Sequence, residues 1–314
     1  MLVIQENRTF NNLFAGFPGA TSSLSGQELV KQGSGYVEQK INLTEANLYD
    51  KTNIAHLYSD FLVGWHKGAM DGFSLIKYKR TQQPEGAAPY QYVNPAKIAP
   101  YRTMASQWGL ADEIFATQGS DSFTAHQDLI RGGTFVSSTE SLIDPPTSPY
   151  VWGCDSSPGA KTSVITTKLK LKVDAGPFPC SNKFPNYGSD GYKTLRDLLD
   201  AKSLSWKYYA PKFGQKTPDG MWNAFDVIAP VRYGPEWANN ISSPETTILT
   251  DIADGNLAAM SWVVPDGNNS DHPGYGIKDT GPSWVASIVN AIGASSYWDS
   301  TAVIVVWDDW GGFY

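Results

Sequence analysis

Long hydrophobic runs, cysteine and histidine are scarce in this sequence of 314 residues. No apolar run approaches the roughly 18 to 20 residues that a membrane-spanning helix needs, and no signal peptide is recognisable. The chain holds two cysteines and four histidines, and two cysteines alone do not make a standard zinc site. The net charge of −7 argues against unspecific nucleic-acid binding, which needs a basic surface. Nucleic acid is therefore not an expected partner.

Several common catalytic signatures are also missing. The sequence has no Walker A loop and no dinucleotide-binding glycine fingerprint. The string around Ser122, "GSDSFTA", is not the G-x-S-x-G elbow of a serine hydrolase. A sulfatase-type enzyme would usually carry a C/S-x-P-x-R string, which is absent too. These absences direct attention to acidic and hydroxyl side chains.

The residues that are present predict one α/β domain with a largely parallel sheet, because helical and strand patterns alternate. We expect a strand in "LVIQEN" that ends at Glu6 and Asn7, and a final strand over 302–306 that is buried on both faces. Between them, helical patterns cover 96–116 and follow the glycine-flanked loop of 119–133. Helix–strand pairs are expected in 192–211 and 244–265, and a helix begins near Pro282. Residues 20–55 are expected to form a polar excursion and 135–190 a cap or insertion.

Acidic residues stand where the first and last predicted strands end. In open α/β sheets, ligands bind at the carboxyl ends of the strands. If the two strands are parallel neighbours, Glu6, Asp308 and Asp309 converge there with the amide of Asn7. Such oxygen ligands suit a divalent cation, which would also offset the repulsion between adjacent carboxylates. A solvated turn before Gly311 and Gly312 is the simpler interpretation of that stretch taken alone.

Ser122 and the histidines are candidates for the chemistry itself. A hydroxyl beside a metal ion is activated as a nucleophile, and a helix that starts near Ser122 offers amide groups to an oxyanion. His126 follows Ser122 by one helical turn and could face the same side. His272 lies in a polar loop directly after a predicted strand, where it could protonate a leaving oxygen. His66 is expected to be structural.

Cys154 and Cys180 lie in a stretch rich in Pro, Gly, Ser and Lys. They could form a disulfide in an oxidising compartment or remain free thiols, and the sequence leaves both open. Met1 leads directly into a strand pattern and Tyr314 follows two glycines. We therefore expect a fragment from which a targeting segment is missing.

Five strings in this order resemble the bacterial phosphoesterase family, which includes non-haemolytic phospholipases C and acid phosphatases. They are "VIQENRTFNNLFAGFPGA", "HLYSDFLVGWHKGAMDGF", "QGSDSFTAHQDLI", "SWVVPDGNNSDHP" and "STAVIVVWDDWGGFY". The resemblance extends over nearly the whole chain. It implies an alkaline-phosphatase-like fold, with a central, mostly parallel sheet between helices and the family's C-terminal part missing.

The resemblance also implies a set of site residues. The metal ligands would be Glu6, Asn7, Ser122, Asp308 and Asp309, and the ion could be Ca, Zn, Mg or Mn. Ser122 would also be the nucleophile, His272 or His56 would bind phosphate or protonate the leaving group, and the role of His126 is open. The family usually has proline where Thr124 stands, and this chain has no histidine between His126 and His272. These departures concern the substrate pocket.

The implied activity is metal-dependent hydrolysis of a phosphoric ester through a phosphoserine intermediate. The substrate would be a phospholipid head group or a small phosphomonoester, with transient contact to a membrane surface and export to the periplasm or beyond. Trp65, Trp222 and Trp237 could line an apolar mouth or pack in the core. The alternatives are a truncated or binding-only homologue and, less favoured, a sulfatase-like hydrolase. The sequence does not indicate an oligomeric state.

Overall fold

The computed structural model describes residues 1–147, 153–177, 180, 191–212, 222–275 and 279–314. The chain divides into two units. The first contains residues 1–4, 121–267 and 287–306, and the second contains residues 5–120, 268–286 and 307–314. No helix in the described ranges is both long and apolar enough to span a membrane.

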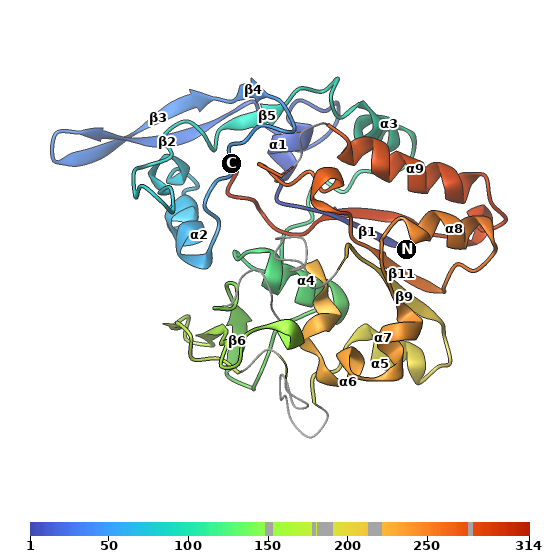
Figure 1. The fold of residues 1–314 in the computed structure, drawn as a ribbon. Helices are drawn as coiled ribbons and strands as arrows, with labels where there is room; N and C mark the ends of the chain where they lie inside the picture. The colour runs from blue at the N-terminus through green and yellow to red at the C-terminus, as the bar shows by residue number, and fades with distance from the viewer. Residues whose placement is uncertain (148–152, 178–179, 181–190, 213–221, 276–278) are drawn as a thin grey trace. The chain divides into compact units, whose positions relative to one another are not determined.

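A five-stranded parallel sheet is the centre of the first unit (Figure 1). Its order is β10 (Ile241–Ser242), β9 (Trp206–Tyr209), β11 (Met260–Val263), β1 (Leu2–Gln5), β12 (Ile304–Trp307). β1 pairs with β11 through Val3 opposite Val263, and β9 pairs in parallel with β10 and β11. On the other side of β1, the amide of Ile304 donates to the Met1 carbonyl. The predicted mixed α/β class with a mostly parallel central sheet is confirmed.

The final strand differs from its prediction in one respect. β12 was expected to be buried on both faces, but Ile304 is 56% exposed and the three residues after it are only partly buried. The reason is position: β12 is an outer strand of this sheet, whereas β1, with Val3 and Ile4 fully buried, lies inside it. A continuous apolar run predicts a strand but does not tell an inner strand from an outer one.

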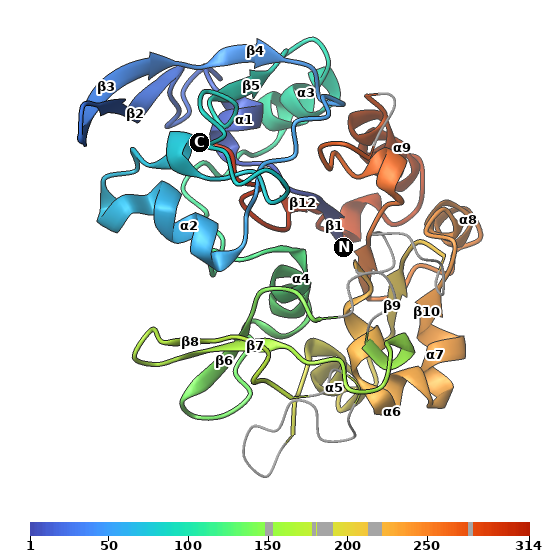
Figure 2. The same cartoon turned by 60° about the vertical axis from the view of Figure 1, so that its left-hand side comes forward.

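The rest of the first unit surrounds an aromatic core of Trp206, Tyr208, Phe225 and Trp262. Figure 2 shows the antiparallel sheet β6–β7–β8, which lies within the predicted cap segment. Its strands are β6 (Glu140–Ile143), β7 (Ser163–Thr166) and β8 (Leu171–Lys172). The helices are α4 (Ser122–Arg131), α5 (Leu195–Asp200), α6 (Ala229–Arg232), α7 (Pro235–Asn240) and α8 (Thr247–Ala253), with 3-10 turns η3 (Gly153–Asp155), η6 (Ala224–Val227) and η8 (Trp298–Ser300). α9 (Gly281–Gly293) begins in the second unit's residues and ends in the first unit's.

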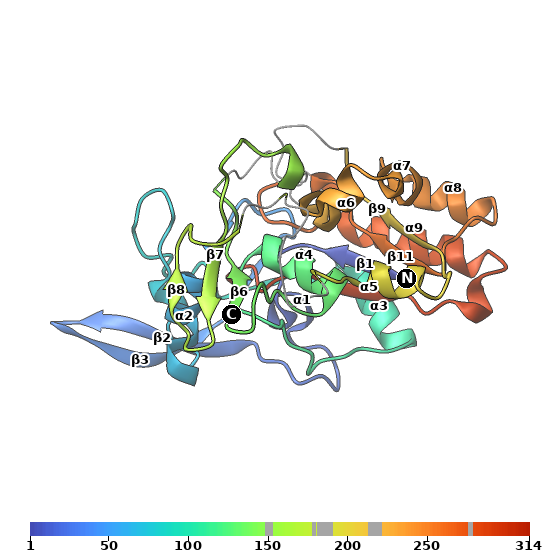
Figure 3. The ribbon, with the colours of Figure 1, turned by 90° about the horizontal axis from the view of Figure 1, so that it is seen from below.

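In the second unit, the polar excursion predicted for 20–55 contains regular structure. Figures 1 and 3 show its main element, a long antiparallel ribbon of two strands, β2 and β3. The strands of this unit are β2 (Ser25–Gln32), β3 (Gly35–Asn42), β4 (Thr44–Ala46) and β5 (Gln91–Val93). Its helices are α1 (Phe10–Phe14), α2 (Tyr58–Trp65) and α3 (Ala99–Gln107), with the turns η1 (His66–Gly68) and η2 (Phe73–Leu75); η7 (Gly267–Asn269) starts in the first unit.

The helix predicted over 96–116 is too long. α3 ends at Gln107, because Trp108 leaves the helical conformation just before Gly109. Tyr101 and Trp108 are both large aromatic residues of the predicted helix. Tyr101 is buried, but Trp108 is 57% exposed. Residues 109–120 contain no helix, and so the periodicity beyond Gln107 is accidental.

The end of the chain is anchored in the core of the second unit. Phe313 lies in a buried cluster with Ile54, Phe73, Ile76 and Tyr90. Gly312 has a left-handed φ of 79°, and a Cβ atom there would lie 2.5 Å from the side chain of Ile54. Glycine is therefore required at this position, because the backbone conformation and the close approach both exclude a side chain. This packing holds the segment that carries Asp308 and Asp309.

Candidate active site

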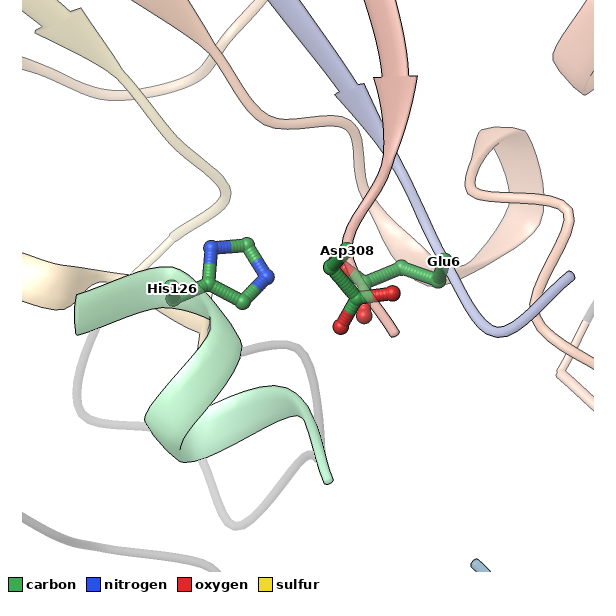
Figure 4. A group of neighbouring side chains, drawn as sticks. All are labelled: Glu6, His126 and Asp308. Atoms are coloured by element: carbon green, nitrogen blue, oxygen red, sulfur yellow. The ribbon is translucent and has the colours of Figure 1, made fainter. Parts of the chain in front are cut away.

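The acidic residues after β1 and β12 lie together in the second unit. The amide of Asp308 donates to the Gln5 carbonyl (2.9 Å), which continues the pairing of the two strands. The backbone amide of Asn7 then donates to Oδ1 of Asp308 (2.8 Å). Glu6 and Asp308 each offer an oxygen within 4.8 Å of the other, and both residues are buried (Figure 4). The predicted convergence of Glu6, Asn7 and Asp308 is present in the structure.

Asp309 and Asn7 are positioned by a tight turn. Asn7 has a left-handed φ of 58°, and its carbonyl lies so close to Gly311 that a Cβ atom there would be 2.1 Å away. The amide of Gly311 donates to Oδ1 of Asp309 (2.7 Å). Strain at Asn7 is tolerated because asparagine adopts this region more readily than most residues. The two glycines of "WDDWGGFY" thus serve the placement of the carboxylates.

His56 joins this group from the segment before α2. Its Nδ1 donates to the Ile54 carbonyl (2.6 Å), and so its Nε2 accepts a hydrogen from the Asn7 side-chain amide (2.8 Å). Nε2 also lies 3.9 Å from Oδ2 of Asp309. This arrangement fixes the direction of the Asn7 amide, with its NH₂ group toward His56.

His272 lies in the same unit, in the loop after β11. The amide of Glu6 donates to the Ser270 carbonyl (2.8 Å), and the His272 amide donates to the Ser270 hydroxyl (3.2 Å). Nδ1 of the His272 ring donates to the Pro273 carbonyl (2.8 Å), which leaves Nε2 as the acceptor of the neutral ring. Burial, and then the nearby charge of His56, lowers the pKa of His272 to about 3. The ring is therefore neutral near pH 7.

A buried network around Asp271 was not foreseen from the sequence. Asp271 accepts from the Tyr101 hydroxyl (2.7 Å) and from Nε1 of Trp307 (3.1 Å), while its carbonyl accepts from Nε of Arg8 (2.9 Å). Burial raises the pKa of Asp271 to about 6, and burial lowers that of Arg8 to about 10. The network ties the loop of His272 to the residues that follow β1. Asp271 precedes His272 directly, which is the one signal in the sequence that could have indicated it.

Ser122 and His126 lie in the first unit. Ser122 is the first residue of α4, His126 follows one turn later, and both are buried. The loop predicted over 119–133 is wrong, because residues 122–131 are themselves helical and Gly132, with a left-handed φ of 76°, caps the end of α4.

Two contacts hold α4 in the first unit. Nε1 of Trp262 on β11 donates to the Leu129 carbonyl (3.1 Å), and Nε2 of Gln127 donates to the Ala224 carbonyl (2.9 Å). The hydroxyl of Tyr192 in turn donates to Oε1 of Gln127 (3.1 Å). A long-range hydrogen bond from a central strand thus sets the position of the helix that carries Ser122.

The donor set fits a divalent cation. Two buried carboxylates within 4.8 Å of each other repel unless a positive charge lies between them, and their oxygens are hard ligands. Figure 4 draws the two carboxylates with His126, which is also buried and also of a residue type that ligates metal ions. His126 belongs to the first unit and the carboxylates to the second.

A second group of charges lies in the first unit, where Asp226 is buried and Arg232 and Asp155 are partly buried. Arg232 donates from Nη2 to Oδ1 of Asp155 (2.9 Å), and its Nε lies 3.2 Å from Oδ1 of Asp226. The guanidinium also stands over the ring of Trp237, 4.5 Å from its centre. Burial, and then the charge of Asp155, raises the pKa of Asp226 to about 8. Trp237 therefore packs against a structural ion pair.

The remaining residues singled out in the sequence have clear positions. Cys154 and Cys180 form a disulfide, which decides between the two alternatives left open. Trp222 is buried in the first unit, whereas Trp65 on α2 is 39% exposed. Nδ1 of His66 donates to Oδ1 of Asp71 (2.6 Å), as expected of a structural residue.

Comparison with known proteins agrees with the motif resemblance. The profile described as "Phosphoesterase family" matches residues 1–314. The chain is 22% identical to "Non-hemolytic phospholipase C" of Pseudomonas aeruginosa in an alignment that covers 100% of this chain and 42% of that protein. "Phospholipase C A" and "Phospholipase C B" of Mycobacterium tuberculosis match 45% of this chain, at 27% and 21% identity, over 28% of their own lengths. The chain spans less than half the length of these relatives.

Proposed function

We propose that this chain, which belongs to the phosphoesterase family, hydrolyses phosphoric esters with the help of one divalent metal ion and a serine nucleophile. The observation that carries the proposal is the pair of buried carboxylates, Glu6 and Asp308, at the ends of β1 and β12. A cation there offsets the charge of the carboxylates and, during the reaction, that of the phosphoryl oxygens. The relatives named phospholipase C favour a phosphodiester, and a phosphomonoester is the alternative substrate.

Each residue has a distinct role in this proposal. Glu6, Asn7, Asp308 and Asp309 would hold the ion, since the His56 contact turns the NH₂ of Asn7 away and leaves its oxygen for a ligand role. Ser122 would contact the same ion and attack phosphorus in line. The ester oxygen leaves, and a phosphoserine remains until water releases phosphate or the phosphorylated head group. The amide groups at the start of α4 would stabilise the phosphoryl oxygens.

The histidines would manage protons and the substrate anion. His272 would protonate the leaving oxygen, with His56 as the alternative donor. A pKa of about 3 keeps the His272 ring neutral before substrate arrives, and a bound phosphate anion would raise that pKa because it favours the imidazolium. His126 would serve as a further ligand or contact the phosphoryl group.

Two wider expectations accompany the activity. An alkaline-phosphatase-like fold agrees with the parallel sheet and with Ser122 at the start of a helix. Export from the cytoplasm agrees with the disulfide between Cys154 and Cys180, because such bonds persist in oxidising compartments. A binding-only homologue is the competing proposal.

The decisive experiment measures hydrolysis of p-nitrophenyl phosphate and p-nitrophenylphosphorylcholine, with and without a chelator. Ser122→Ala should abolish turnover, while Ser120→Ala, a buried serine two residues earlier, should retain most of it. Turnover of the choline diester alone would indicate a phospholipase C-like enzyme, and turnover of the monoester a phosphatase. Full activity in Ser122→Ala would refute the nucleophile. No turnover by a folded protein with bound metal would favour the binding-only homologue.

A further inference from the structure

Helix α2 in the second unit turns apolar side chains toward solvent. Of its eight residues only Gly64 is buried, where the helix packs closely on Phe73 and Ile76. Leu62 is 42% and Val63 38% exposed on the outer side. A helix of a globular protein normally buries its apolar stripe and exposes polar residues. α2 exposes apolar side chains instead, and its buried contact with Phe73 and Ile76 is made by Gly64.

Trp65 is held in an exposed position on the same helix. Its ring stacks on Phe61 with 6.2 Å between centroids, and Phe61 stacks on Tyr58 at 6.4 Å. Met70 follows after the turn η1 and is 41% exposed. The stack restricts the rotamers of Trp65. The side chain therefore loses little further conformational entropy when it contacts a partner.

The exposed charges of the segment that contains α2, residues 58–85, are all positive. Residues 58–85 are fully described, and their four cations are all exposed: Lys67, Lys77, Lys79 and Arg80. Their three carboxylates are not. Asp71 and Glu85 are buried, and the partly buried Asp60 accepts from the Leu57 amide. A local excess of four exposed cations is unusual in a chain whose net charge is −7.

The segment is one structural piece. The amide of Gly72 donates to the Gly64 carbonyl (3.2 Å), and η2 packs against α2. Lys77 follows η2 by two residues and begins a tight hairpin, in which the Tyr78 amide donates to the Gln83 carbonyl (2.9 Å). Exposed apolar side chains and exposed cations therefore belong to a single folded segment, which we call the α2 surface (residues 58–85).

We propose that the α2 surface binds the face of a phospholipid bilayer that contains anionic lipids. Leu62, Val63 and Trp65 would enter the boundary between head groups and acyl chains, as exposed apolar residues of interfacial helices do. The four cations would lie among the lipid phosphates, where each is worth about a fivefold gain in affinity. The inference rests on the proposed function only in naming lipid as the substrate source; the surface itself is defined by exposure and charge.

The hairpin of β7 and β8 is a region of similar composition. It exposes Leu169 at its tip, between Lys168 and Lys170. Its third lysine, Lys172, pairs with Glu140, and Asp174 is exposed nearby, so that its surface charge is partly neutralised. Residues 163–172 of this hairpin form no helix and include no aromatic side chain. This hairpin serves as a matched control for the α2 surface.

The test is sedimentation of Ser122→Ala protein with vesicles of phosphatidylcholine alone or mixed with phosphatidylglycerol, at low and at high salt. Ser122→Ala prevents the lipid from being consumed. We expect binding to the mixed vesicles that weakens with salt. Combined Leu62→Ser and Trp65→Ala should reduce binding by at least about tenfold. Combined Lys77→Gln, Lys79→Gln and Arg80→Gln should reduce binding to mixed vesicles on the order of 100-fold and change binding to pure phosphatidylcholine little.

The control variant combines Lys168→Gln, Leu169→Ser and Lys170→Gln and should bind as the parent does. If the control loses binding and the α2 variants keep it, the site is the β7–β8 hairpin and the proposal is wrong. Equal binding to both vesicle types would also overturn it, as would binding of another protein by α2 in place of lipid. In active protein, the combined Lys77→Gln, Lys79→Gln and Arg80→Gln variant should leave hydrolysis of the water-soluble p-nitrophenyl esters unchanged. Vesicle binding without any ester hydrolysis would refute the proposed function alone, and hydrolysis without vesicle binding would refute the α2 surface alone.

Discussion

Two groups of carboxylates, one in each unit, are stabilised in different ways. In the first unit, Asp155 and Asp226 share the guanidinium of Arg232. In the second unit, Asp308 accepts the amide of Asn7 and Asp309 accepts that of Gly311. The first group contains its own cation, whereas these two hydrogen bonds of the second come from neutral backbone amides.

The difference shows what a buried acidic group requires. Even with Arg232 beside it, Asp226 has a pKa of about 8, because burial and Asp155 outweigh the guanidinium. One fixed cation is therefore not enough to keep two carboxylates ionised in the first unit. Arg8, which lies next to the acidic group of the second unit in sequence, directs its guanidinium to the carbonyls of Asp271 and Leu48. Carboxylates that accept hydrogen bonds from backbone amides can still bind an exchangeable divalent ion. Carboxylates that pair with an arginine have a structural role instead.

The largest effect should separate the two groups by activity. Asp308→Asn is expected to lower kcat/KM on the order of 1,000-fold and to reduce the bound metal, because it removes an anionic ligand. Asp226→Asn should keep activity within a few-fold, since it lies in the structural group. Steady-state kinetics and metal analysis of both proteins decide the matter. An equal loss of activity in the two variants would contradict the functional distinction between the two groups of carboxylates.

Removal of the metal is the next effect in size. A ligand that binds only the folded state at about 100 times its Kd stabilises by about 3 kcal/mol. A chelator should therefore lower the Tm of the wild type and of Arg232→Met, but not that of Asp308→Asn. Thermal unfolding of the three proteins with and without chelator provides the measurement. A wild-type Tm that ignores both chelator and added divalent ions would contradict the assignment of a metal site.

Loss of the guanidinium should destabilise the first unit. Arg232→Met removes the partner of two carboxylates and is expected to cost on the order of 2 kcal/mol, discounted because the arginine is partly exposed. Metal content should not change. Denaturant unfolding measures the stability, and the double variant Arg232→Met, Asp226→Asn should recover part of the loss. Failure of the second substitution to compensate would argue against a coupled pair.

The smallest effect is a pH dependence of stability. The folded pKa of Asp226 is about 8, above the value of roughly 4 in an unfolded chain. The folded state therefore holds the proton more tightly, and this contribution is complete below about pH 4 and is lost as the pH rises toward 8. Relative to Asp226→Asn, the wild type should lose on the order of 1 kcal/mol between pH 7 and 8. Unfolding of both proteins at the two pH values tests this, and parallel pH profiles would speak against a raised pKa.

Four of the five strands of the parallel sheet and the position of α9 could be predicted from local sequence. β1, β9, β11 and α9 lie within the segments expected for them, because β-branched runs, Pro282 and the Asp254–Gly255 turn act locally. The errors have a common cause. The excess length predicted for the helix over 96–116 and the double burial predicted for β12 were both inferred from apolar residues, and apolar residues do not reveal whether a partner covers them.

The candidate site divides in the same way. The approach of Glu6, Asn7 and Asp308 followed from two strand ends, and it required only that β1 and β12 be parallel neighbours. The contact between His56 and Asn7 could not be derived without the resemblance to the family, since 49 residues separate them. The network of Arg8, Tyr101 and Asp271 was missed because each residue has an ordinary local context. Their common environment arises only on folding.

By itself, the sequence determined the α/β class, the strand ends that carry the acidic residues, and the family, because these depend on periodicity and on motifs within short segments. The tertiary structure decided which strand is central, that Cys154 meets Cys180, which carboxylates have a cation of their own, and which helix exposes its apolar face. Those features depend on burial and on long-range partners. The free energy of a buried charge or an exposed tryptophan is set by its neighbours in space, and these are absent from the linear chain.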